Sequence, residues 1–216
     1  MKEFVLKLKE GKIDLFKKDY HEMVAAFNRE VATTRGYNGR QILELLQNCD
    51  DQKSDSVFIK IDKENCTLSI ANKGVPFSRE GYRSLATSNL SSKIDKTQYI
   101  GNKGLGFRSI LNWSNEIAIF SNRFKVSYSD LQRERIFSSI FDELIRNEIR
   151  TKYKLPESIF PIPMLAVPEI TETERYQEYA TVIELGFKER FLQSIIEQIN
   201  SITPETIGNH SVFTSY

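Results

Sequence analysis

Apolar and polar residues follow two different periods along this chain, and the changes of period predict its secondary structure. Apolar side chains spaced by three and four residues predict an amphipathic helix over residues 13 to about 35 and a second over residues 40 to about 50. The same pattern predicts a helix over about 131–153 and a closing helix over 187–202. In the second helix the apolar residues occupy one side, whereas Glu44 and Asn48 share another.

Strict alternation of apolar and polar residues predicts strands between these helices. One hairpin joins residues 57–61 to 68–70, a second joins 116–120 to 123–128, and residues 179–185 form a further strand. The prolines at 156, 161, 163 and 168 exclude a regular helix there, and residues 164–167 are predicted as a short strand.

Paired strands separated by helices predict an α+β fold. The expected architecture is a two-layer sandwich, with a mixed, mostly antiparallel sheet and helices on one of its faces. With 216 residues, of which 40% are hydrophobic, the chain can bury the core of one domain, with or without an appendage.

Charge and cysteine content limit the partners and the cellular compartment that we expect for the protein. Thirty basic and 29 acidic residues leave a net charge of +1, so the chain carries no strong signal for nucleic acid or membrane binding. Cys49 and Cys66 lie in apolar patterns that favour reduced core residues, which predicts an intracellular, cytoplasmic protein. No apolar run is long enough for a signal peptide or a membrane span, so we expect a soluble chain.

Three segments carry candidate chemistry. They are the helical pair Glu44 and Asn48, the turn formed by Asn72 and Gly74, and a loop with glycines at 101, 104 and 106. Each has an ordinary structural explanation. The helical pair can be a solvated helix face, Asn72 and Gly74 can be simple turn residues, and the glycines can form a loop before a helix at Phe107. The glycines leave backbone N–H groups uncovered, as phosphate binding requires, although the P-loop pattern is absent.

Taken together and in this order, the three segments resemble the GHKL family of ATP-binding domains, which includes Hsp90, DNA gyrase, MutL and sensor histidine kinases. The similarity covers about residues 20–200 and is closest to the sacsin and plant NOV branch, through residues 44–51, 91–93 and 100–107. The resemblance implies the Bergerat-type fold of that family. It also implies an N-terminal extension over 1–20, an ATP-binding domain over 20–202 with a lid at about 78–107, and a tail or linker over 203–216.

The resemblance assigns a role to each segment. It implies that Glu44 is the catalytic base for hydrolysis and that Asn48 binds Mg²⁺, with ATP and Mg²⁺ as the cofactors. The implied ATP contacts are Asn48, Asp51, Asn72, Gly74, Lys93, Gly101, Asn102, Lys103, Gly104, Leu105, Gly106, Phe107 and Thr181. Lys73 and Arg108 are interpreted as surface charges.

One position departs from the family pattern. The family usually offers an Asp to the adenine amino group, where this chain has Asn72, and Pro76 replaces a glycine often found after it. An amide can turn either its oxygen or its nitrogen toward a base, so modest discrimination between ATP and GTP is expected.

Three functions fit these features. The first is an ATP-hydrolysing switch within a longer protein, with ATP or ADP, further domains and a nucleotide-dependent homodimer as partners. The second is an ATP-sensing module without hydrolysis. The third is a histidine-kinase catalytic domain, although His21 and His210 lie in no evident phosphoacceptor motif.

Overall fold

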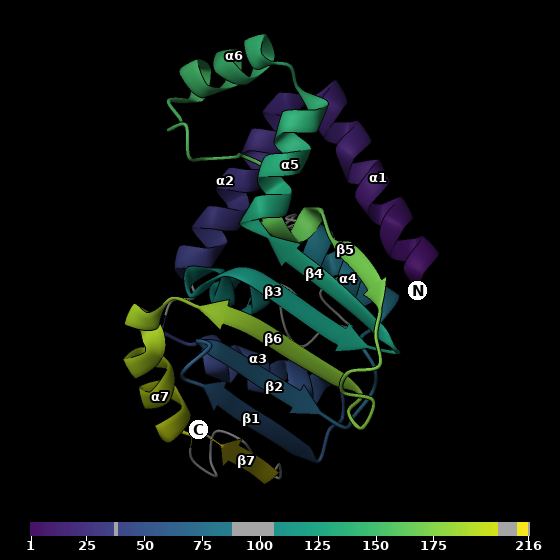
Figure 1. Ribbon diagram of the computed structural model, residues 1–216, viewed down its shortest axis with the longest axis vertical. Coiled ribbons are helices and arrows are strands. Elements are labelled where there is room, and N and C mark those ends of the chain that lie inside the picture. The colour runs from purple at the N-terminus through teal and green to yellow at the C-terminus, as the bar shows by residue number, and fades with distance from the viewer. Residues whose placement is uncertain (37–38, 88–105, 203–210, 216) are drawn as a thin grey trace, which may run out of the picture.

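The chain folds into one sheet with helices on one face and a helical projection at one end (Figure 1). The computed structural model describes residues 1–36, 39–87, 106–202 and 211–215. The predicted α+β fold, with a mixed and mostly antiparallel sheet, is confirmed.

The described strands form a seven-stranded sheet in the order β5-β4-β3-β6-β2-β1-β7. Neighbouring strands are antiparallel, except that β7 runs parallel to β1. The strands are β1 (Ser56–Asp62), β2 (Thr67–Asn72), β3 (Ser114–Ser121), β4 (Phe124–Ser129), β5 (Glu169–Glu172), β6 (Thr181–Phe187) and β7 (Ser211–Ser215). Both predicted hairpins, β1-β2 and β3-β4, are therefore present, and β6 separates them.

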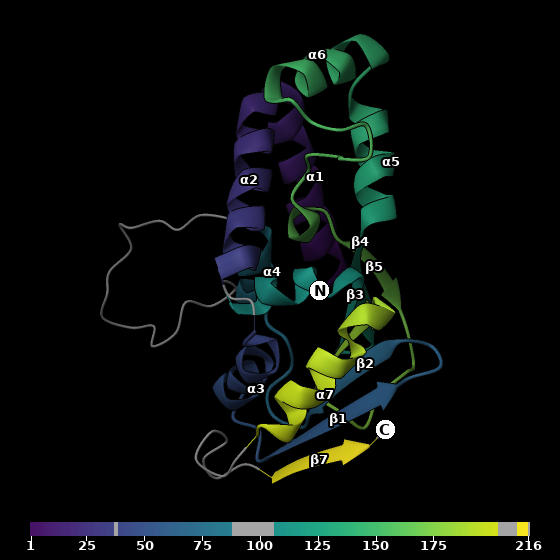
Figure 2. The same cartoon turned by 90° about the vertical axis from the view of Figure 1, so that its left-hand side faces the viewer.

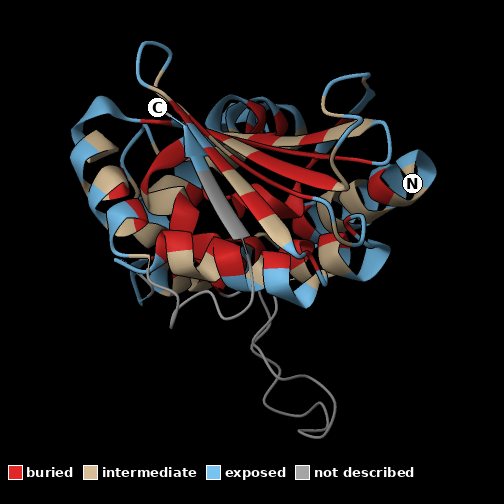
Figure 3. Cartoon of the chain, turned by 90° about the horizontal axis from the view of Figure 1, so that it is seen from below, coloured by how far each residue is buried: buried red, intermediate tan, exposed pale blue. Residues whose placement is uncertain are grey.

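The main core lies between the sheet and the helices on its inner face. Alternate strand residues such as Ile59, Leu68, Ile119 and Ile183 are buried there, and each such side chain contributes about 1.5–3 kcal/mol by burial. Figure 3 shows the buried residues gathered where the strands meet the helices. The elements on this face include α3 (Gln41–Asp51), α4 (Arg79–Ala86), α7 (Leu192–Asn200) and the 3₁₀ helix η1 (Gly106–Asn112).

The helical projection has a second apolar core, which includes Phe16, Met23, Phe137 and Ile149. It is built from α1 (Lys2–Lys18), α2 (Tyr20–Gly36), α5 (Asp130–Ile140) and α6 (Glu143–Tyr153) (Figure 2).

The prediction of one helix over residues 13–35 is wrong, because the chain breaks at Asp19. The backbone of Asp19 is extended, and its carboxylate accepts hydrogen bonds from the N–H groups of His21 and Glu22. Asp19 thus caps the start of α2, which fixes a new helix direction.

The predicted helix over 131–153 is also two helices. Phe141 is extended and buried in the second core, and the Asp142 carboxylate accepts a hydrogen bond from Ile145 N–H. Asp142 is therefore the N-cap of α6, and burial of Phe141 turns the chain between the two helices.

Residues 164–167 do not form the predicted strand. Met164–Ala166 is the 3₁₀ helix η2, because the buried Glu30 carboxylate accepts from Met164 N–H at 2.6 Å and from Leu165 N–H at 3.3 Å. The strand of this region is β5, which begins after Pro168. The closing helix is preceded by a short 3₁₀ turn, η3 (Glu189–Phe191), and the helix predicted at Phe107 is the 3₁₀ helix η1.

Candidate functional site

One face of α3 links several of the residues predicted to bind a nucleotide. Glu44, Asn48 and Gln52 are spaced by four residues, so their side chains share a face that extends for about 12 Å along the helix. Glu44 lies in the first turn and Gln52 is the C-cap residue. Each end of this face contacts another segment of the predicted site.

At the first end, Glu44 lies directly against Gly106. A Cβ atom built on Gly106 would overlap the Glu44 carboxylate, so only a glycine allows this approach. The Glu44 side chain is 14% exposed, and Arg40 Nη2 lies 3.9 Å from its Oε1. The predicted catalytic carboxylate therefore contacts the last glycine of the predicted phosphate loop.

At the other end, Gln52 contacts the turn after β2. Asn72 Nδ2 donates to Gln52 Oε1 at 2.9 Å, and Val75 N–H donates to the Gln52 carbonyl at 2.7 Å. Gly74 packs so closely that a Cβ atom on it would overlap the Gln52 carbonyl oxygen. The turn is thus held against the C-terminal end of α3.

Three polar residues form a row across the sheet beside this turn. Asn72 of β2 is paired with Thr181 of β6, which is paired with Ser121 of β3. Ser121 Oγ donates to the Ala180 carbonyl and accepts from Phe77 N–H. Thr181 Oγ1 is fully buried and has no hydrogen-bond partner among the described residues. The row gives the inner face of the sheet a polar end.

The other predicted residues are placed as follows. Asn48 is half-buried between the two ends of the α3 face, and the described chain offers its side chain no hydrogen bond. Asp51 is exposed, with no hydrogen bond or ion pair to the described Asn72 turn. The Phe107 side chain belongs to the main core, so only its backbone can serve a ligand. Lys93, Gly101, Asn102, Lys103, Gly104 and Leu105 lie outside the described residues.

Arg108 is not the predicted surface charge. It is 2% exposed, and its Nη2 donates to the carbonyls of Leu85 at 2.7 Å, Thr87 at 3.2 Å and Ser84 at 3.4 Å. These carbonyls end α4, where a cation is also favoured by the helix dipole. Arg108 therefore ties η1 to α4.

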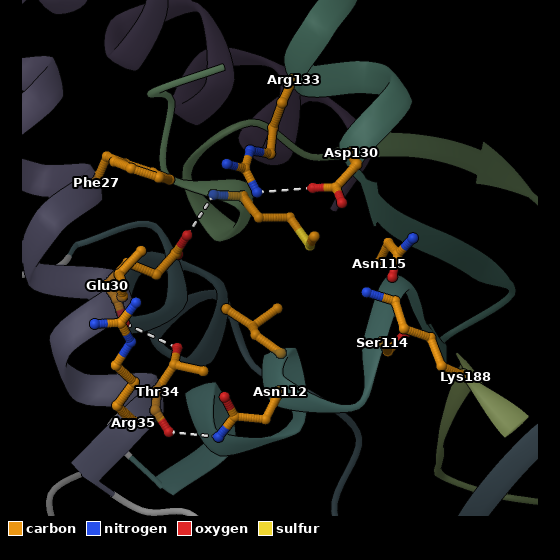
Figure 4. Close-up of a pocket in the computed structure, with 13 residues that line it drawn as sticks. Phe27, Glu30, Thr34, Arg35, Asn112, Ser114, Asn115, Asp130, Arg133 and Lys188 are labelled. Carbon is orange, nitrogen blue, oxygen red and sulfur yellow. Dashed lines mark hydrogen bonds and ion pairs between the residues drawn. The ribbon is translucent and has the colours of Figure 1, made fainter. Parts of the chain in front are cut away.

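A separate cleft of about 220 Å³ lies among α2, η1, α5 and η2 (Figure 4). Glu30, Asn112, Arg133 and Lys188 contribute polar groups to its lining, and none of the described residues predicted to bind ATP lines it. Burial raises the pKa of Glu30, although Arg133 and two backbone N–H groups oppose that effect. The cleft and the α3 face are thus different features.

Gln52 and Ser121 were missed by the sequence analysis. Gln52 follows Asn48 by four residues, so helical spacing alone would have placed it on the same face. Ser121 follows Ile117 and Ile119 at alternate positions, which predicts the same inward side of β3.

Comparison with known proteins gives a partial similarity. No family model matches the chain. The chain is weakly similar to Protein NO VEIN of Arabidopsis thaliana, with 32% identity over 90 residues. The aligned part is 40% of this chain and 3% of that protein, so the chain corresponds to a small portion of its relative. Within the described residues, no helix has the length and apolar character needed to cross a membrane.

Proposed function

We propose that the chain is a Mg²⁺-dependent ATP-binding domain that hydrolyses ATP slowly and acts as a switch within a longer protein. The contact between Glu44 and Gly106 carries the proposal, because it joins the helical carboxylate to the glycine-rich segment across more than 60 intervening positions. The resemblance of the three motifs to GHKL domains and the partial similarity to Protein NO VEIN support it.

The α3 face suits an elongated ligand. Phosphates would lie at the Gly106 end, where backbone N–H groups can approach them closely, and the base would lie at the Asn72 end. The buried Thr181 Oγ1, which has no partner among the described residues, fits a role as a polar group in the base site. Asn72 and Thr181 are 2% and 0% exposed, so they would form the floor of that site.

Each polar residue of the face has a chemical role in this proposal. Asn48 would give one amide oxygen to Mg²⁺, a cation that takes few protein ligands and binds mainly through phosphates and waters. When bound, the cation would neutralise phosphate charge. Glu44, one turn earlier on the same face, would orient a water and accept its proton. The nucleotide state would then be read by other domains or by a second copy of the chain.

Calorimetry with MgATP and MgADP tests the proposal. We expect binding that weakens when Mg²⁺ is chelated. Glu44→Gln should retain binding and lose phosphate release by about two to four orders of magnitude, as removal of a general base does. Asn48→Ala should lose the Mg²⁺-dependent part of the affinity.

The control is Glu64→Gln, at an exposed glutamate in the β1-β2 turn. Absence of binding to either nucleotide at millimolar concentration would refute the proposal. If both proteins bind ATP but release phosphate only at the background rate, the chain is a nucleotide-sensing module. If they release it at the same rate above background, Glu44 is not catalytic.

A further inference from the structure

The cleft among α2, η1, α5 and η2 has the size and lining of a site for a small molecule (Figure 4). Its volume of about 220 Å³ lies below the range of about 300–1,000 Å³ that is typical of pockets for drug-sized ligands, so it suits a smaller one. Phe27, Val31, Leu111 and Met164 form the apolar part of the lining. The other lining residues are polar or charged and come from segments far apart in the sequence.

The two acidic side chains of the lining already have partners. The Asp130 carboxylate accepts a hydrogen bond from Arg133 Nη1 at 2.7 Å. The Glu30 carboxylate accepts from two backbone N–H groups of η2, and both Arg133 and the buried Arg108 favour its charged form. Neither carboxylate therefore needs a cation from a ligand.

The basic side chains Arg35 and Lys188 have no such partner. Among the residues that the structure describes, neither side chain makes an ion pair or a hydrogen bond. Arg35 lies in the last turn of α2, whereas a hydrogen bond from Lys188 N–H to the Trp113 carbonyl holds Lys188 beside β3 (Figure 4). Two unpaired cations around one concave surface give it a positive potential, which attracts an anion.

The walls of the cleft are already held in place by contacts within the protein. Arg133 Nη2 donates to the Phe160 carbonyl at 3.0 Å, and the Arg133 guanidinium lies 5.3 Å from the centre of the Phe27 ring. On the η1 side, Asn112 Nδ2 donates to the Thr34 carbonyl at 2.8 Å. A lining that is fixed before binding lowers the entropy cost of holding a ligand.

We propose that this cleft binds a small organic anion, a carboxylate or a phosphate ester, whose charge is held by Arg35 and Lys188 and whose apolar body packs against Phe27 and Leu111. Arginine and lysine are the usual partners of both kinds of anion. The site is separate from the proposed ATP site, because none of the described residues predicted to bind ATP lines the cleft.

Calorimetry and NMR with four simple compounds test the site. Benzoate and phenyl phosphate carry a charge on an aromatic ring, benzyl alcohol has the ring without the charge, and inorganic phosphate has the charge without the ring. The two aromatic anions should bind with millimolar affinity, as compounds of this size do, and should shift the backbone amide signals of Asn112 and Lys188. The other two compounds should bind at least about threefold more weakly. Benzoate should bind equally well when MgATP is present.

Variants of the two cations test their role. Lys188→Met and Arg35→Met each remove a charge and keep an apolar stem, so each should weaken benzoate binding by about two- to fivefold and the double variant by about tenfold. Lys60→Met, at an exposed lysine that does not line the cleft, is the matched control and should bind benzoate as the parent does. Circular dichroism checks that each variant is folded, and if one unfolds, the amide signals that benzoate shifts in the parent decide the location.

Four results would each overturn the inference. They are no binding of either aromatic anion at millimolar concentration, equal binding of benzyl alcohol and benzoate, displacement of benzoate by MgATP, and parent-like affinity in the folded double variant. None of them bears on whether the chain binds ATP, so the inference and the proposed function can fail separately.

Discussion

Substitution of Gly74 by alanine tests the junction between α3 and the turn that would hold the base. The added Cβ atom would overlap the Gln52 carbonyl oxygen and would lie 2.9 Å from both Gln52 C and Ser54 N. All three atoms belong to the backbone and cannot rotate away, so the turn itself must move. The hydrogen bond from Val75 N–H to the Gln52 carbonyl would be strained at the same time.

The expected loss follows from three contributions. Overpacking costs about 1–3 kcal/mol and a strained hydrogen bond about 1 kcal/mol. Restriction of the unfolded chain by alanine offsets about 0.4–1 kcal/mol. The free energy of unfolding should therefore fall by about 1–3.5 kcal/mol, which for a chain of this size lowers the melting temperature by about 2–14 °C.

The loss of stability is measured by thermal and urea unfolding of Gly74→Ala beside two other variants, Gly186→Ala and Gly106→Ala. Gly186→Ala is the control, because nothing lies within 4 Å of its added Cβ, and it should stay within about 1 kcal/mol of the parent. Gly106→Ala should also unfold close to the parent, since the overlapping atoms are the flexible end of Glu44. Equal stability of Gly74→Ala and Gly186→Ala would show that the turn does not pack against α3 as described.

Two further predictions concern buried charges. Arg108→Met should lower the free energy of unfolding by about 2–3 kcal/mol, because the carbonyls that end α4 lose a charged donor. The control Arg135→Met, at an exposed arginine, should change the free energy of unfolding little. Equal losses in the two variants would contradict the role of Arg108. Burial raises the pKa of Glu30 above its ordinary value of 4.5, so the unfolded chain releases this proton first as pH rises. The parent should therefore lose stability relative to Glu30→Gln from about pH 4.5 up to the raised pKa, and a constant difference across denaturation curves at several pH values would refute this.

The sequence predicts those parts of the fold in which local pattern and tertiary contacts agree. The two hairpins and α3 have clear periods and are present as predicted. The breaks at Asp19 and Asp142 were missed because apolar spacing continues across both, and a capping aspartate is recognisable only once the new helix direction is known. Met164 forms a 3₁₀ turn because Glu30, 134 residues away, accepts its N–H, which no local pattern encodes.

In the candidate site, too, some features are predictable from the sequence and others depend on tertiary contacts. Motif spacing places Glu44 and Asn48 on one helix face, and the structure agrees with that geometry, while their roles stay predictions. Arg108 was misinterpreted because a lone arginine in sequence gives no sign of the carbonyls it will meet. The contacts of Gly106 with Glu44 and of Gly74 with Gln52 likewise depend on the packing of distant segments, so the sequence supplies the glycines without their partners.

The position of β6 has a consequence for the order in which the chain folds. The β1-β2 and β3-β4 hairpins are local and can form early, but neither pairs with the other, since β6 pairs with β2 on one side and β3 on the other. Such long-range pairing is slow to form. During synthesis the two hairpins cannot join into one sheet until residues 181–187 have been made, and their inner edges stay unpaired until then. Asn72, Thr181 and Ser121 become neighbours only in that step, so a nascent chain acquires its polar row, and any ligand affinity that depends on it, only after residues 181–187 have been made.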